Sequence, residues 1–91
     1  MANVIITLKI MPKSTDVNLD EVEKKATELI AKFGGDVGKT SKEPIAFGLR
    51  SLNIIFVMDE AKGSTEELEN SISELDGVNS VEVIDVRRAI G

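Results

Sequence analysis

Two stretches that are apolar on both faces constrain the fold more than any other feature of the chain. Residues 3–11 and 51–58 are rich in β-branched and aliphatic side chains, a pattern typical of strands in the centre of a sheet. Each is followed by a helical pattern and then by another strand. This order predicts an α+β, ferredoxin-like βαββαβ sandwich, a four-stranded antiparallel sheet with two helices on one face. That topology puts the first and third strands, the two most apolar ones, in the centre.

Start and stop signals frame the two helices. Asn18 with Glu21 has the spacing of a capping box, and Gly34 follows the last helical apolar residue. Ser64 with Glu67 repeats the spacing before a second helix, which is expected to end at 76–77. The remaining strands are expected over 36–42, where lysines suit a sheet edge, and over 80–86.

The composition argues against most kinds of enzyme chemistry. The 91 residues suggest one domain, 1–91, and they include no His, Cys, Trp or Tyr. We therefore expect no enzyme, no metal and no cofactor. A net charge of −5 argues against direct binding of nucleic acid. The chain has neither a signal-peptide pattern nor an apolar run of membrane-spanning length, so a cytoplasmic protein without a membrane partner is expected.

Several known functions of ferredoxin-like domains fit this sequence poorly. An RNA-recognition domain stacks bases on aromatic side chains of the central strands, and these strands carry only Phe56. A metal-transfer domain needs a Cys pair, which the chain lacks. Acyl-phosphate hydrolysis needs an Arg and a glycine-rich phosphate loop, and residues 12–18 contain neither Arg nor Gly. Acidic residues such as Asp16 and Asp20 could suggest a cation site. They are better explained as first-turn residues, whose negative charge interacts favourably with the helix dipole.

The segment 43–50, expected as a loop, is the first candidate site. Pro44 and Gly48 would shape the loop around Phe47, and Arg50 flanks it. An aromatic residue on such a loop is a candidate for contact with a partner. The alternative is that Phe47 folds back and caps the sandwich.

Two further features are open to a functional interpretation. Arg87 and Arg88 follow the last expected strand, and they either deliver a cation to a partner or form a solvated basic end. The sheet face without helices is the other feature. One register would leave Ile5, Ile55, Val57 and Ile84 near it, and such a patch can mark an interface.

Several of these residues resemble the archaeal elongation factor 1-beta family over essentially the whole chain. The resemblance lies in the runs 9–12 (KIMP), 44–54 (PIAFGLRSLNI), 77–78 (GV) and 84–88 (IDVRR). It implies a guanine nucleotide exchange factor that promotes GDP release from the GTPase elongation factor 1-alpha during translation elongation. It also implies that Phe47, presented by Pro44 and Gly48 and flanked by Arg50, lies at the partner interface.

The resemblance is incomplete at the C-terminus. Eukaryotic members place a lysine next to the last residue, near the Mg²⁺ site of the partner, whereas this chain ends in Ala-Ile-Gly. Either Arg87 or Arg88 takes that role from a slightly different position, or exchange relies on wedging and on distortion of the switch regions of the GTPase. Arg is a planar fork and Lys a compact charge, so the two are not equivalent.

One other class of function is compatible with the pattern. A small ferredoxin-like regulatory or ligand-binding domain would act as a homodimer, whereas the exchange factor is expected to be a monomer when free. The lysine-bearing edge strand and the lack of a glycine-rich loop after the first strand favour the exchange factor.

Overall fold

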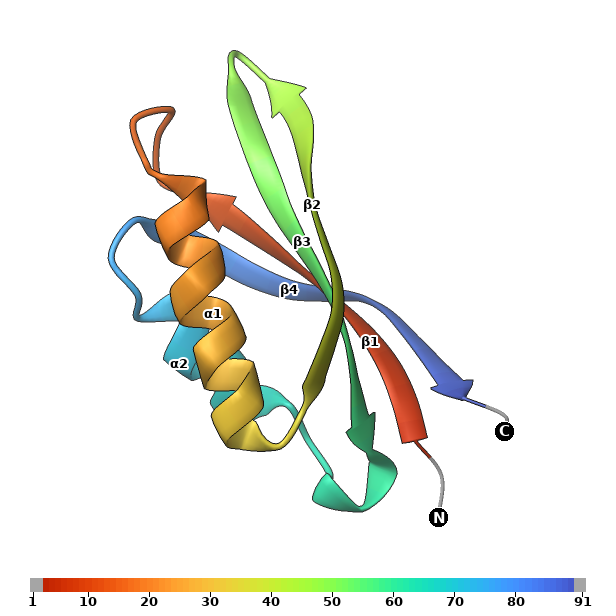
Figure 1. The fold of residues 1–91 in the computed structure, drawn as a ribbon. Coiled ribbons are helices and arrows are strands. Elements are labelled where there is room, and N and C mark those ends of the chain that lie inside the picture. Colours follow the sequence, from red (N-terminus) through yellow and green to blue (C-terminus); the bar gives the residue numbers. More distant parts are fainter. Residues whose placement is uncertain (1–2, 90–91) are drawn as a thin grey trace.

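The computed structural model describes residues 3–89 and confirms the predicted fold. Figure 1 shows two helices packed on one face of a four-stranded antiparallel sheet. The elements are β1 (Asn3–Pro12), α1 (Leu19–Phe33), β2 (Asp36–Ala46), β3 (Leu49–Asp59), a 3-10 turn η1 (Glu60–Lys62), α2 (Glu66–Ser73) and β4 (Val78–Ala89). The strand order β2-β3-β1-β4 places β1 and β3 in the centre, as their apolar sequences predict.

The core lies between the helices and the central strands. Alternate residues of β1 and β3 face the helices, and Phe56 is the largest fully buried side chain. The core comprises Ile6, Leu8, Ile10, Val22, Ala26, Ile30, Leu52, Ile54, Phe56, Met58, Leu68, Ile72 and Val78.

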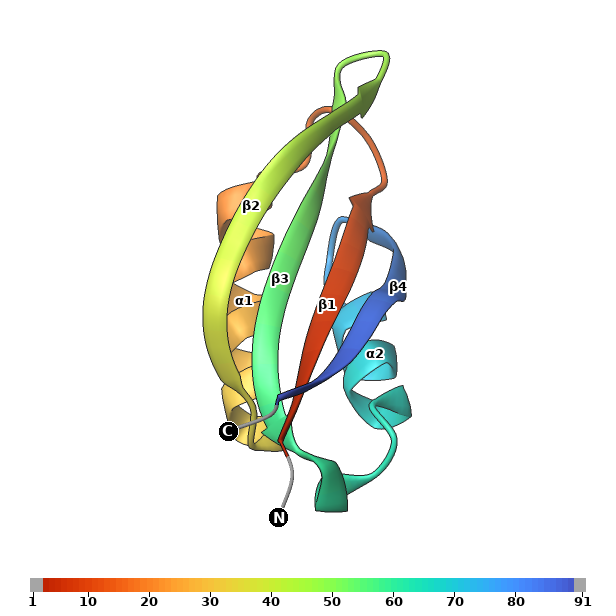
Figure 2. The same cartoon turned by 90° about the vertical axis from the view of Figure 1, so that its right-hand side faces the viewer.

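The strand register settles which residues lie on the face without helices. Ile5 pairs with Val57 and Thr7 with Ile55, and these pairs alternate with the core-facing ones. Figure 2 shows this face, with the helices behind the twisted sheet. Ile5, Ile55 and Val57 are half-buried there, as predicted. Ile84 has no partner residue on β1, because the register of β4 shifts at this point, and it is 49% exposed.

The ends of α1 confirm the predicted signals, whereas those of α2 do not. The Asn18 side chain accepts hydrogen bonds from the backbone N–H groups of Asp20 (3.0 Å) and Glu21 (3.3 Å). Gly34 ends α1 with a φ of 104°, in the left-handed region. The second helix begins after Thr65, because Ser64 instead accepts a hydrogen bond from the Glu66 N–H in a local turn (3.0 Å). It also ends earlier than predicted, at Ser73.

Two boundary predictions near the candidate sites are wrong. The segment 43–50 is no loop: β2 and β3 continue as a hairpin, and only residues 47 and 48 lie between them. Pro44 is tolerated inside β2 because this strand is at the edge of the sheet. Arg87 and Arg88 belong to β4, where they pair with Ile5 and Val4, rather than following it.

Candidate functional site

The tip of the β2–β3 hairpin presents an aromatic side chain in an unfavourable backbone conformation. Phe47 has a φ of 53° and Gly48 a φ of 81°, so both turn residues are left-handed, as a two-residue type I′ connection requires. Asn, Asp and Gly are the usual residues in such turns. A side chain in the left-handed region costs roughly 1–2 kcal/mol, so Phe47 is retained against a local preference.

The ring of Phe47 does not contribute to the core. The residue is 98% exposed, so the alternative that it folds back onto the sandwich is wrong. Strained backbone positions are concentrated at functional sites, and an exposed aromatic ring adds almost nothing to the stability of the free domain. The ring is therefore available for another surface.

The residues around the tip extend this apolar projection. Pro44 lies opposite Arg50. The register shifts between Pro44 and Ala46, so Ile45 has no partner residue on β3. Ile45 is 44% exposed. The structure thus brings Pro44, Phe47, Gly48 and Arg50 together at one end of the sheet, as predicted, and adds Ile45 to them.

The connection between β1 and α1 lies against the turn. A Cβ atom on Gly48 would be 3.5 Å from Cγ2 of Thr15, so the threonine methyl group contacts the turn. The other side of this connection is fixed by the Lys13 N–H, which donates to the Gly77 carbonyl at 2.8 Å. The turns after β1, β2 and α2 are therefore at the same end of the molecule.

A hollow of about 410 Å³ lies between this connection and the hairpin. Lys42 and Arg50 line it from the hairpin, and Ser14, Thr15 and Asp20 line it from the connection and the start of α1. Lys42 forms an ion pair with Asp20, and this hydrogen bond raises the pKa of Lys42 above its ordinary value.

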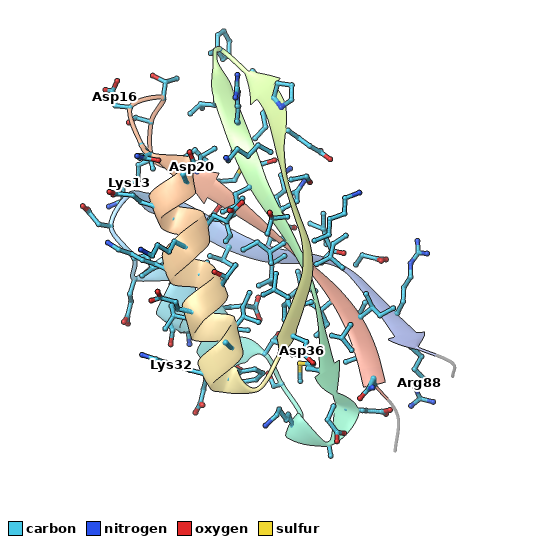
Figure 3. All side chains as sticks on the ribbon, viewed as in Figure 1. Lys13, Asp16, Asp20, Lys32, Asp36 and Arg88 are labelled. Carbon is cyan, nitrogen blue, oxygen red and sulfur yellow. The ribbon has the colours of Figure 1, made fainter. Side chains whose placement is uncertain are left out.

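Two arginines of β4, Arg87 and Arg88 (the arginine pair), lie far from the hairpin tip. Arg87 donates to Asp85 at 2.9 Å, and Arg88 donates to Glu60 of η1 at 2.6 Å. Both side chains are largely exposed. In Figure 3, Asp16 and Asp20 mark the hairpin end, and Arg88 lies at the opposite end.

The separation of the two candidate groups follows from the register. Arg87 pairs with Ile5, which pairs with Val57, and Val57 is ten residues along the strand from Phe47. At about 3.3 Å per residue, the two groups are roughly 30 Å apart. The structure therefore does not bring the arginine pair to Phe47.

Sequence reasoning missed three residues of the hairpin end. Ile45 could not be identified, since its exposure depends on a register shift. Lys42 and Asp20 are 22 positions apart in sequence, and their contact depends on how the start of α1 packs against the sheet. Within residues 3–89, no group of three or more acidic residues is placed to hold a metal ion, and no helix is long and apolar enough to cross a membrane.

Comparison with known proteins decides the family. The chain matches the EF-1 guanine nucleotide exchange domain over residues 5–89. It belongs to the EF-1 guanine nucleotide exchange domain family. It is 46% identical over 88 residues to elongation factor 1-beta of Methanothermobacter thermautotrophicus, covering 97% of this chain and 98% of the relative. It is 38% identical over 89 residues to that of Methanocaldococcus jannaschii, covering 98% and 100%.

This membership confirms the predicted role of the exchange domain. The chain acts in guanine nucleotide exchange on elongation factor 1-alpha in translation elongation. Solved structures add the fold alone. The ACT domain of a GTP pyrophosphokinase from Chlorobium tepidum has a TM-score of 0.62 at 18% identity and covers 90% of this chain and 99% of that one. The C-terminal domain of Mycobacterium tuberculosis MgtC has a TM-score of 0.61 at 15% identity, covering 98% and 88%.

Proposed function

We propose that this exchange domain speeds GDP release by binding elongation factor 1-alpha through the hairpin tip and the arginine pair. The observation that carries the proposal is Phe47, which is 98% exposed and left-handed at the end of the hairpin. In this proposal Pro44 and Gly48 shape the tip, Arg50 flanks it, and Arg87 and Arg88 supply cations at the other end.

The distance between the two groups sets what the partner must offer. A GTPase that contacts both groups needs two contact regions roughly 30 Å apart, since ten strand residues separate them. β3 is paired with β2 along this whole length and with β1 from Leu52 to Asp59, so the sheet holds the two groups at a set spacing. Binding at the hairpin tip would then fix where the arginine pair meets the GTPase.

Exchange needs no bond chemistry from this chain. A factor that binds the nucleotide-free GTPase more tightly than the GDP-bound form must, by reciprocity, weaken the binding of GDP. Couplings of this kind are typically about 1–3 kcal/mol, a change of ~5–150-fold in affinity. A chain without His, Cys, Trp or Tyr can supply such coupling through contacts alone.

The same proposal covers the extent, location and oligomeric state of the domain. Residues 1–91 act as one exchange domain in the cytoplasm, and the domain is not an enzyme. It is a monomer when free, and it binds the GTPase without direct contact to nucleic acid. The polar edge strand β2, which carries Lys39, Lys42 and Pro44, supports the monomer because such edges resist pairing with other chains.

The test measures release of a fluorescent GDP analogue from elongation factor 1-alpha, with and without this protein, at several Mg²⁺ concentrations. We expect acceleration, and acceleration that shrinks when Mg²⁺ is removed would mean that the factor weakens the metal site of the GTPase. Acceleration independent of Mg²⁺ would favour wedging by the hairpin tip. No acceleration with the cognate GTPase would refute the proposal.

A further inference from the structure

The hollow beside the hairpin has a definite orientation. Lys42 pairs with Leu52, and Arg50 pairs with Pro44. Since side chains alternate between the two faces of a strand, Lys42 and Arg50 lie on the same face as the buried Leu52, which is the helix side. Figure 1 shows that the hairpin extends beyond the start of α1, so no helix covers this part of the face. The β1–α1 connection closes the other side of the hollow.

The charges that line the hollow leave one cation without a partner. Lys42 is neutralised by its ion pair with Asp20. Arg50 is exposed, and among residues 3–89 no carboxylate forms an ion pair with it. The hydroxyl-bearing Ser14 and Thr15 add polar groups opposite these cations. An anionic group that enters the hollow would therefore meet an unpaired guanidinium.

We propose that the hollow receives a carboxylate side chain of the GTPase, which Arg50 binds while Phe47 contacts an apolar surface beside it. This inference rests on the proposed function, because it takes the hairpin end as the side that faces the GTPase. A guanidinium offers two parallel N–H donors to a carboxylate, and such charge-assisted pairs are among the stronger polar contacts. The hollow thus specifies the chemistry of the surface next to the aromatic contact.

The surroundings favour a single carboxylate over a phosphate backbone. Acidic residues lie in the β1–α1 connection (Asp16) and in the first turns of α1 (Asp20, Glu21 and Glu23). A polyanion laid across the hollow would meet Asp20, which lines it, as well as Arg50, and like charges brought together oppose binding. One acidic side chain reaches Arg50 from the open side without passing along α1.

The experiment measures the affinity of the full chain for nucleotide-free elongation factor 1-alpha at two salt concentrations. Arg50→Glu reverses the charge in the hollow, Arg50→Lys keeps it without the fork, and Asp20→Asn removes the internal competitor for the cations. Lys39→Glu is the matched control, because Lys39 is an exposed cation of the same hairpin that pairs opposite Ile55, away from the hollow. Circular dichroism and a melting curve confirm that each variant is folded.

We expect Arg50→Glu to weaken binding by roughly tenfold or more, with a larger loss at low salt, and Lys39→Glu to stay within about threefold of wild type. Arg50→Lys should lose less than Arg50→Glu, and Asp20→Asn should not weaken binding. If wild type accelerates GDP release but Arg50→Glu binds within about threefold of it, the inference is overturned and the proposed function stands. Weaker binding by Asp20→Asn would also overturn it, because the GTPase would then use the acid of the hollow. A wild type that does not accelerate release refutes the proposed function instead.

Discussion

Replacing Phe47 by glycine should make the domain more stable and less active. The residue is 98% exposed, so at about 25 cal/mol per Å² its remaining burial contributes on the order of 0.1 kcal/mol. Its φ of 53° costs roughly 1–2 kcal/mol for a residue with a Cβ atom. Glycine removes that cost but gives the unfolded chain about 0.4–1 kcal/mol of extra freedom. The net gain is about 0–1.5 kcal/mol with a midpoint of about 0.7 kcal/mol, and the midpoint should raise Tm by about 3–6 °C in a domain of this size.

Two other variants separate the ring from the backbone. Phe47→Ala keeps the left-handed Cβ and removes the ring, so its free energy of unfolding should be within about 0.5 kcal/mol of wild type. Phe56→Ala is the core control and should lose about 3–5 kcal/mol, because Phe56 is fully buried.

The assays are urea unfolding and GDP release with elongation factor 1-alpha. Both Phe47 variants should lose exchange activity equally, although glycine is the more stable of the two. The reasoning is refuted if Phe47→Ala loses 2 kcal/mol or more, if Phe47→Gly is less stable than Phe47→Ala, or if either variant exchanges at the wild-type rate.

Changing both residues of the arginine pair to alanine should slow GDP release more than it weakens binding to the GTPase; equal losses would make the pair a docking contact only. Gly77→Ala should lower the free energy of unfolding by more than Gly48→Ala. Both glycines have positive φ, but a Cβ at Gly77 would lie only 2.9 Å from the Val17 side chain, whereas one at Gly48 would make an ordinary contact with Thr15 at 3.5 Å. Equal losses in urea would show that strain alone matters there. The hydrogen bond to Asp20 raises the pKa of Lys42, so its contribution is present below the unfolded pKa of about 10.4 and is lost as pH rises through the higher folded value. The difference in unfolding free energy between wild type and Asp20→Asn should therefore shrink as pH rises above about 10.4.

The sheet could be predicted because its information is local. The apolar strands 3–11 and 51–58 indicate their central position by composition, and the Asn18 cap and Gly34 mark α1 by chemistry that involves only neighbouring residues. The end of α2 was predicted too late because Leu75 continues the helical spacing although it lies beyond the helix. It packs against the core from the following turn, so apolar periodicity alone could not show where the helix ends.

The hairpin was misread for a related reason. Pro44 and Gly48 are turn residues by propensity, and together they suggested a loop over 43–50. In the fold Pro44 is accepted by an edge strand, which needs no N–H donor on its outer side, and the turn shrinks to two residues. Whether Phe47 was core or exposed depended on this difference, since a long loop can fold back over the sandwich and a two-residue turn cannot.

The position of the arginine pair shows why membership of a site needs the register. Phe47 and Arg88 were both proposed as partner contacts, and nothing in their spacing along the chain says whether they meet. The antiparallel pairing of β4 with β1 and of β1 with β3 carries them to opposite ends of the sheet. A substitution at one end cannot act on the other through direct contact. A measured coupling between Phe47→Ala and Arg88→Ala in exchange would therefore have to pass through the sheet or through the bound GTPase, and additive effects would mean that the two ends act on the GTPase independently.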